Sequence, residues 1–252
     1  MSPGVRRGMG SLIAALVGLG VWFALASLRF AGKPVIATPL EVMRVLPSAS
    51  PALAADVLAT TYRAFLGLGI GVLGGMAMGV LAALVVSRAP IVDGALDFAR
   101  SVPPVVLLPM FLLAFGYDET ARVATIAAGC AWTMALAVTT AAGTERSARR
   151  ELLDLAGATK IEAALWTQPW EALPALAVGL RASASTAVIV AVVTEMVAGA
   201  ERGVGSRVIS AQIASDTAIL TLNVIAVGAV GYLANVGLRR LESVARRFTS
   251  LG

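Results

Sequence analysis

Long apolar runs without a charged residue most constrain the fold of this chain. Residues 12–28, 123–142 and 217–238 contain no Asp, Glu, Lys or Arg. About 20 apolar residues are what an α-helix needs to cross the hydrocarbon core of a bilayer. Only 14% of the residues are charged and the mean hydropathy is +0.84, whereas a soluble domain carries about 25% charged residues. The sequence therefore predicts an all-α membrane protein, because helices satisfy their own backbone hydrogen bonds in lipid.

Missing residue types remove several function classes. The chain has no histidine, and Cys130 is its only cysteine, so neither a Cys/His metal site nor an internal disulfide can form. A membrane enzyme would need convergent catalytic groups, and the apolar runs hold few polar ones. The phosphate-loop motif G-x-x-x-x-G-K-[ST] is also missing, so we expect this chain to bind no ATP and no other cofactor.

Hydropathy predicts one membrane domain, residues 1–252, with six spans at about residues 12–28, 60–86, 102–116, 123–142, 175–197 and 217–238. The first span has an alternative as a cleaved secretory signal, because Ala24 and Ala26 are small. The prolines between residues 34 and 51 predict a non-helical loop, and Pro174 predicts a helix start. Glycines of the second span recur every three or four residues and predict a close packing face: Gly67, Gly71, Gly74, Gly75 and Gly79.

Positive charges indicate which side of the membrane each loop faces. An even number of spans places both termini on one side. Lys and Arg are more frequent at the termini and near residues 88–100 and 146–160 than in the alternate loops. The positive-inside rule therefore predicts cytoplasmic N- and C-termini and a cytoplasmic loop at residues 145–170. The pI of about 10.1 reflects this bias, and we expect no nucleic-acid partner.

The loop at residues 145–170 is amphipathic. Charged and apolar residues alternate at helical spacing between residues 151 and 165, which predicts two short helices. They meet near Gly157, and glycine permits a left-handed turn or a close backbone approach. One interpretation is a solvated loop. The other is a docking element, because exposed apolar side chains need a partner surface or lipid headgroups.

Several motifs resemble one family of transport proteins. Glu151, Gly157 and the pair Leu173–Pro174 have the spacing of the EAA loop in the membrane subunits of ATP-driven bacterial (ABC) importers. The segments RSVPPVVLLPMFLLAFGYDETARV and GLRASASTAVIVAVVTEMVAGAERGVGSRV are similar to segments of the nitrate, sulfonate, taurine and bicarbonate permeases. The resemblance extends from about residue 38 to residue 240.

This resemblance implies a type I ABC importer permease in the bacterial inner membrane. It implies two copies of a cytoplasmic ATPase that bind ATP and magnesium, a second permease subunit in a homodimer, and an extracytoplasmic substrate-binding protein. The substrate would be a small anion such as a sulfonate or nitrate. Leu152 and Leu153 stand where the family has two alanines, so the docking surface is bulkier. The resemblance assigns ATPase coupling to Glu151, Leu152, Leu153, Leu155, Ala156, Gly157, Ala158, Thr159 and Lys160.

Some side chains within the spans are candidates for the translocation pathway. Glu195, near the outer end of the fifth span, is either a pathway or gate residue, or a carboxylate at the wet mouth paired with Arg202 or Arg207. Trp132 and Thr133 have packing within the bundle as their alternative. The pathway candidates are Thr194, Glu195, Met196, Arg181, Trp132 and Thr133.

Other charged residues have simpler interpretations. We expect Arg63 and Arg181 to extend toward the headgroups, because long basic side chains reach the interface from helix ends. Asp118 and Glu119 predict a solvated turn. The alternative function is an ATP-independent secondary transporter or channel. It would need ion-coupling carboxylates in mid-span, and Glu195 is the one candidate.

Overall fold

The chain folds into packed helices in a computed structural model, which describes residues 3–30, 33–86, 94, 98, 101–142, 155–157 and 160–250. The long helices are α1 (Pro3–Ser27), α2 (Pro39–Val86), α5 (Glu119–Ala142), α7 (Lys160–Ala198) and α9 (Thr217–Ser250). The short ones are the 3-10 helix η1 (Pro104–Leu107), α4 (Leu108–Phe115) and α8 (Val204–Ile213). Strands β1 (Arg29–Phe30) and β2 (Lys33–Pro34) pair antiparallel after α1. The all-α fold class is confirmed.

Four helices in the described residues are long and apolar enough to cross a bilayer: Pro39–Ala82, Glu119–Ala141, Leu173–Ala198 and Thr217–Arg240. Each overlaps a span that hydropathy predicts. Two shorter apolar stretches are Leu16–Ser27, which is part of α1, and Pro104–Phe115. At about 1.5 Å per residue, Pro104–Phe115 is shorter than a hydrocarbon core of about 30 Å. Six crossings and cytoplasmic termini therefore stay predictions.

Helix α2 begins earlier than the sequence predicts. The prolines before residue 60 predict a non-helical loop, but α2 starts at Pro39 and continues through Pro47 and Pro51. That prediction is wrong because a side-chain hydrogen bond replaces the backbone hydrogen bond that a proline cannot make. Pro51 has no N–H to donate to the carbonyl of Pro47, and the Ser50 hydroxyl donates to that carbonyl at 3.1 Å instead.

Helix α2 has a capped start, and α7 begins earlier in the sequence than predicted. Thr38 and Glu41 form a capping box: Glu41 Oε2 accepts from the Thr38 N–H at 2.7 Å, and Thr38 Oγ1 accepts from the Glu41 N–H at 3.3 Å. Helix α7 starts at Lys160 and runs through Pro174, so the predicted helix start at Pro174 is wrong. Membrane helices tolerate interior prolines because neighbouring groups satisfy the freed carbonyls.

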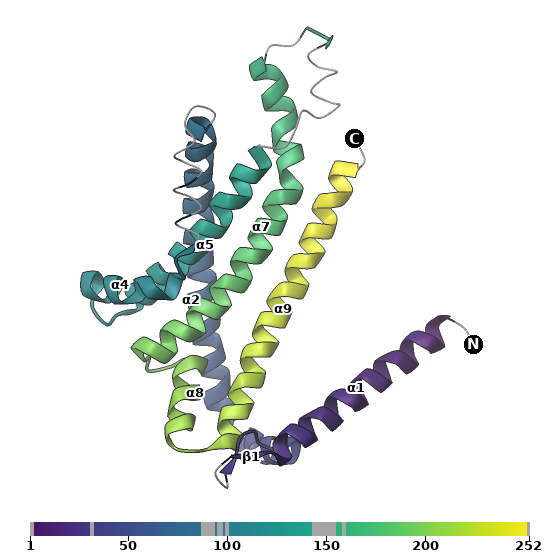
Figure 1. Ribbon diagram of the computed structural model, residues 1–252, viewed down its shortest axis with the longest axis vertical. Helices are drawn as coiled ribbons and strands as arrows, with labels where there is room; N and C mark the ends of the chain where they lie inside the picture. The colour runs from purple at the N-terminus through teal and green to yellow at the C-terminus, as the bar shows by residue number, and fades with distance from the viewer. Residues whose placement is uncertain are drawn as a thin grey trace.

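The core lies where α2, α5 and α7 pack side by side (Figure 1). Glycines of α2 allow α5 to come close: a Cβ at Gly71 would lie 2.5 Å from the Cβ of Cys130, and one at Gly67 would lie 2.5 Å from Cγ2 of Ile126. Gly74 has nothing within 4 Å and faces away. The predicted glycine face is therefore confirmed, with Gly74 as the exception.

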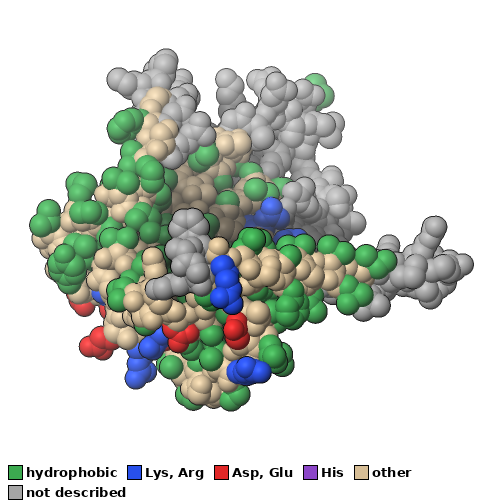
Figure 2. Space-filling model, turned by 60° about the horizontal axis from the view of Figure 1, so that its bottom comes forward, with side chains coloured by type: hydrophobic (Ala, Val, Ile, Leu, Met, Phe, Trp, Pro, Cys, Tyr) green, Lys and Arg blue, Asp and Glu red, His purple; other side chains and the backbone are tan. Residues whose placement is uncertain are grey.

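The two ends of the bundle carry different segments (Figure 1). Helix α7 ends where α8 and α9 begin, and we call this the α8 end. Residues 155–157, the start of α7 and the C-terminus lie toward the opposite end, whereas α1 leans away from the other helices. Figure 2 shows acidic and basic side chains gathered at the α8 end, between flanks covered by hydrophobic side chains.

Candidate functional site

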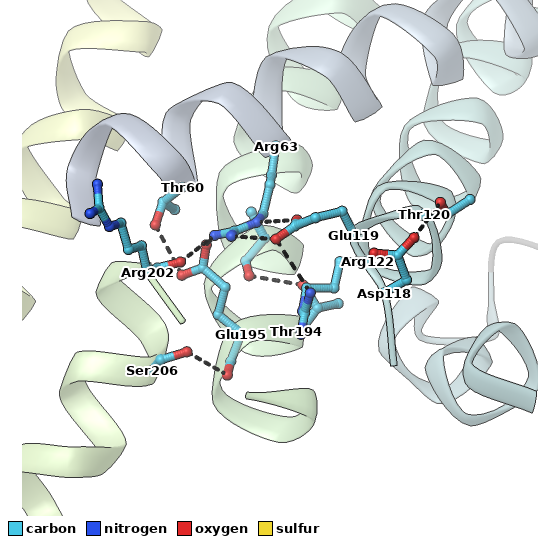
Figure 3. A network of polar contacts seen from close by, with 12 residues as sticks. Thr60, Arg63, Asp118, Glu119, Thr120, Arg122, Thr194, Glu195, Arg202 and Ser206 are labelled. Carbon is cyan, nitrogen blue, oxygen red and sulfur yellow. Dashed lines mark hydrogen bonds and ion pairs between the residues drawn. The ribbon is translucent and has the colours of Figure 1, made fainter. Parts of the chain in front are cut away.

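A buried carboxylate lies at the α8 end. Glu195, near the end of α7, is 0% exposed. Its carboxylate accepts hydrogen bonds from Arg63 Nη1 at 2.6 Å and from Thr60 Oγ1 at 2.9 Å (Figure 3). The backbone N–H of Gly205 donates a third bond at 2.9 Å. Helices α2, α7 and α8 thus meet at this one side chain.

Arg63 joins a second carboxylate to the first. Its Nε and Nη2 donate to the two oxygens of Glu119 at 2.6 and 2.7 Å, and Nη1 also donates to the backbone carbonyl of Arg202 at 2.8 Å. A planar guanidinium suits this two-bond pairing with a carboxylate. Because a buried charge is costly unless it is paired and hydrogen-bonded, Arg63 is what allows Glu195 to lie inside the bundle, whereas the Glu119 side chain is 51% exposed.

A second arginine completes the group. Arg122 Nη1 lies 3.4 Å from Glu119 Oε1, and Arg122 Nη2 donates to the backbone carbonyl of Gly199. The two arginines balance the two carboxylates, so the group is formally neutral. We call Arg63, Glu119, Arg122 and Glu195 the buried charge cluster; Glu119 lies at its edge, with its side chain 51% exposed. It links α2, α5 and α7 with the loop that leads into α8.

One glycine and a second ion pair shape this loop. Gly203 has a φ of 153°, and a Cβ there would lie 2.5 Å from the carboxyl carbon of Glu195. Both features require glycine. Asp56 accepts from the Gly203 N–H at 3.0 Å and from Arg207 Nε at 2.9 Å. The start of α8 is therefore fixed to α2 by polar contacts on both sides of Gly203.

The cluster corrects two predictions. Arg63 is buried and does not extend to the headgroups. Glu195 pairs with Arg63, not with Arg202 or Arg207. Asp118 and Glu119 are both exposed, as predicted for a solvated turn, and Glu119 also pairs with Arg63. The sequence did hold a signal for the Arg63–Glu195 pair. Each of two different spans contains a charged residue of opposite sign, and charges inside a membrane bundle usually face inward and pair.

The neighbours of Glu195 on α7 do not join the cluster. The Thr194 side chain is buried, and its Oγ1 donates to the backbone carbonyl of Ala191 at 2.9 Å. Met196 is half-buried. Both side chains therefore serve helix packing at the α8 end.

The other pathway candidates lie further along α5 and α7. Thr133 lines a cavity of about 440 Å³ between these helices, together with Thr140 and Gly179. The adjacent Trp132 has a buried Nε1 with no hydrogen-bond partner in the described part of the chain. Arg181 is half-buried on α7. The structure does not bring these residues together with Glu195.

The described coupling residues, 155–157 and 160, lie away from the α8 end (Figure 1). Leu155 is 85% exposed, and Ala156 is exposed as well. Gly157 has a φ of 80° and open space where a Cβ would lie, as the predicted left-handed turn requires. Lys160 is the first residue of α7. The remaining coupling residues lie outside the described residues: Glu151, Leu152, Leu153, Ala158 and Thr159.

The fold and the cluster define a class, a multi-pass helical membrane protein whose polar groups pair internally at one end. Within the described ranges no group of His, Cys, Asp and Glu could hold a metal ion. Residues 71–247 match the family model described as "Binding-protein-dependent transport system inner membrane component", and the chain belongs to this family. It is therefore a permease subunit of an ABC importer in the inner membrane. Such a subunit is not itself an enzyme.

Relatives and solved structures agree with this family. An aliphatic sulfonates transport permease protein, SsuC, of Bacillus subtilis is 28% identical over 95% of this chain and 88% of its own length. The taurine transport system permease protein TauC of Escherichia coli is 27% identical over 99% of this chain and 90% of its own length.

The structural neighbours have the type I importer permease architecture. An inward-facing MetNI methionine ABC transporter has a TM-score of 0.66 at 20% identity, and the match covers 79% of this chain and 98% of that chain. A crystal structure of an amino acid ABC transporter with histidines has a TM-score of 0.59 at 21% identity, covering 81% and 97%. At these identities the likeness shows the fold alone.

Proposed function

We propose that this chain forms the translocation pathway of an ATP-driven importer and couples it to a cytoplasmic ATPase. Family membership over residues 71–247 carries the proposal. An ATP-independent transporter would need a buried carboxylate available to a coupling ion. In the described residues the two buried carboxylates, Glu195 and Asp56, are both paired with arginines, which argues against that alternative.

The proposed substrate is a small sulfonate, within a class of small anions that includes nitrate. Two relatives that match nearly the whole chain are named for aliphatic sulfonates and for taurine. A soluble binding protein would deliver the substrate at the outer face. The lipid bilayer and a second copy of this permease would surround the pathway.

Residues 151–160 form the coupling surface in this proposal. The exposed Leu155 would enter a groove on the ATPase, as the apolar face of a docking helix does. The open space at Gly157 would let the groove wall approach the backbone. Two ATPase copies, each with ATP and magnesium, would dock on two permease subunits. Closure of the ATPases would then move the start of α7.

The pathway in this proposal follows α5 and α7. Thr133 borders the cavity of about 440 Å³ between them, and Trp132 and Arg181 lie on the same two helices. Thr194, Glu195 and Met196 would act at the outer end. There the buried charge cluster holds the loop before α8 against α2, so residues of this region would control opening rather than bind substrate.

Reconstitution in proteoliposomes with the ATPase and the binding protein tests the proposal. We expect Gly157→Glu to lower both ATP-dependent sulfonate uptake and ATPase retention at least tenfold, because a charged side chain would enter the docking surface. Gly116→Glu is the matched control, since Gly116 has a φ of 78° and open space around it but follows α4. Sulfonate uptake by the wild-type permease without any ATPase would establish the alternative transporter.

A further inference from the structure

The junction of α7 and α8, residues 199–205, is held by side chains of neighbouring helices. Its backbone N–H groups at residues 203–205 donate at 2.9–3.0 Å to three side-chain oxygens, those of Asp56, Thr60 and Glu195. Two of its carbonyls accept from arginines of the buried charge cluster. Residues 203–205 are buried, so pulling the junction away from α2 would leave several of these groups without partners. The junction is therefore poorly suited to open as a separate lid.

Thr60 joins three helices through one oxygen (Figure 3). It lies on α2 and is 2% exposed. Its Oγ1 donates to Glu195 Oε2 of α7 at 2.9 Å and accepts from the N–H of Val204, the first residue of α8, at 2.9 Å. The carbonyl of Asp56 lies 3.1 Å from the same oxygen, but a charged carboxylate is the stronger acceptor for the single hydroxyl proton. The Thr60 hydroxyl thus fixes the end of α7 and the start of α8 to one point on α2.

Helix α7 connects this point with the other end of the molecule. It is one continuous helix of 39 residues, from Lys160, a predicted coupling residue, to Ala198. A helix of this length spans about 58 Å at 1.5 Å per residue. A movement imposed on the start of α7 would therefore reach Glu195 through a single helix. The contacts of Glu195 then decide which other elements move with it.

We propose that Thr60 is a positioning residue that keeps α8 fixed to α2 and α7 during transport, so that these three helices move as one body. The inference rests on the proposed function, because it concerns the movement that the ATPase would impose on α7. Access at the α8 end changes by movement of the whole body, and the junction stays closed against α2. The hydroxyl is the necessary group, since a valine of nearly the same shape offers neither the donor nor the acceptor.

Distances between two spin labels test whether Thr60 fixes α8. The labels replace Leu58 on α2 and Ile213 on α8, which are 71% and 80% exposed. The background is Cys130→Ala, which removes the only native cysteine. The chain is measured alone in lipid nanodiscs and diluted with unlabelled chain, so that both labels lie in one copy. We expect Thr60→Val to broaden the distribution of label distances; the wild-type width in this variant overturns the proposal.

Two further variants control this measurement. Thr60→Ser keeps the hydroxyl and should keep the wild-type width. Thr125→Val is the matched control, because Thr125 is also buried but its Oγ1 donates to the carbonyl of Ala121 on its own helix, at 2.8 Å. It should leave the distance distribution unchanged. Equal broadening in Thr60→Val and Thr125→Val would show a general loss of packing and overturn the specific role of Thr60.

The assembled importer tests whether the three helices move together. In wild type, the distance between labels at positions 58 and 213 should be the same without nucleotide and with ATP and vanadate. A shift larger than the width of the distribution would show that α8 moves separately from α2, and it overturns the proposal.

The amount of sulfonate transported per ATP hydrolysed tests the positioning role. A general loss of folded chain lowers uptake and ATP hydrolysis together and leaves this ratio unchanged. In proteoliposomes with the ATPase and the binding protein, Thr60→Val should lower the ratio about tenfold, as for the loss of a hydrogen bond to a charged group. Thr60→Ser should restore the ratio, and Thr125→Val should not change it.

The two proposals fail separately. A wild-type chain without ATP-dependent uptake contradicts the importer, whereas the label distances in the chain alone still decide whether Thr60 fixes α8. An unchanged ratio and an unchanged distance distribution in Thr60→Val, with ATP-dependent uptake intact, overturn the role of Thr60 and leave the importer.

Discussion

The two ends of this molecule differ in the burial and pairing of their side chains. At the α8 end, Arg63 and Glu195 are buried and paired with each other. At the other end, Leu155 is apolar and 85% exposed, and Gly157 has open space around it. The first end holds its own helices together, whereas the second exposes an apolar side chain that we propose an ATPase covers. Stability and coupling should therefore respond to different substitutions.

The largest expected effect is on stability at the α8 end. Arg63→Met leaves the buried Glu195 without its cation, whereas the exposed Glu119 keeps Arg122, and breaking a buried ion pair in this way costs about 3–5 kcal/mol. Denaturant unfolding of the purified chain in detergent micelles measures the change. Arg63→Met combined with Glu195→Leu should recover part of the loss, because no uncompensated charge remains at the centre of the cluster. Equal stability of wild type and Arg63→Met would show that the cluster does not hold this end.

A smaller loss of stability is expected when Gly203, which lies against Glu195, is replaced. Gly203→Ala places a methyl group 2.5 Å from the carboxyl carbon of Glu195 at a φ of 153°. Backbone strain and overpacking together predict a loss of about 3 kcal/mol. Gly199→Ala separates the two causes, because Gly199 has a φ of 67° but nothing within 4 Å. If both variants lose the same stability, contact with Glu195 contributes nothing.

The sequence predicts the helices of this protein better than their contacts. Uncharged runs such as residues 123–142 identify spans, because hydropathy and length decide insertion. The start of α2 is missed because a local bond from Ser50 offsets the proline at residue 51. The pair Arg63–Glu195 joins residues 132 positions apart, and hydropathy does not say which helices lie side by side. The left-handed turn at Gly157 is predicted correctly, because such a turn depends on the local sequence.

The ion pair of Asp56 with the partly exposed Arg207 should matter less for stability than the buried charge cluster. Asp56→Asn removes the charge opposite Arg207 but keeps an oxygen that can accept from the Gly203 N–H. We expect a loss of about 1 kcal/mol, because the Arg207 side chain is partly exposed and solvent screens the pair. Melting temperatures of wild type and variant, measured at low and high salt, should converge as salt rises. A difference that is independent of salt would indicate lost packing instead of a lost ion pair.

The smallest effect on stability is expected at the coupling end, and it is the sharpest test of the comparison. Leu155→Ser changes a side chain that is 85% exposed, so the free energy of unfolding should stay within about 0.5 kcal/mol. ATPase retention during co-purification should nevertheless fall about tenfold or more, because burying a leucine at an interface contributes about 1.5–3 kcal/mol. Leu113→Ser is the matched control, since Leu113 is 90% exposed on α4, and it should leave retention unchanged. A Leu155→Ser variant that loses stability but keeps the ATPase would reverse the roles assigned to the two ends.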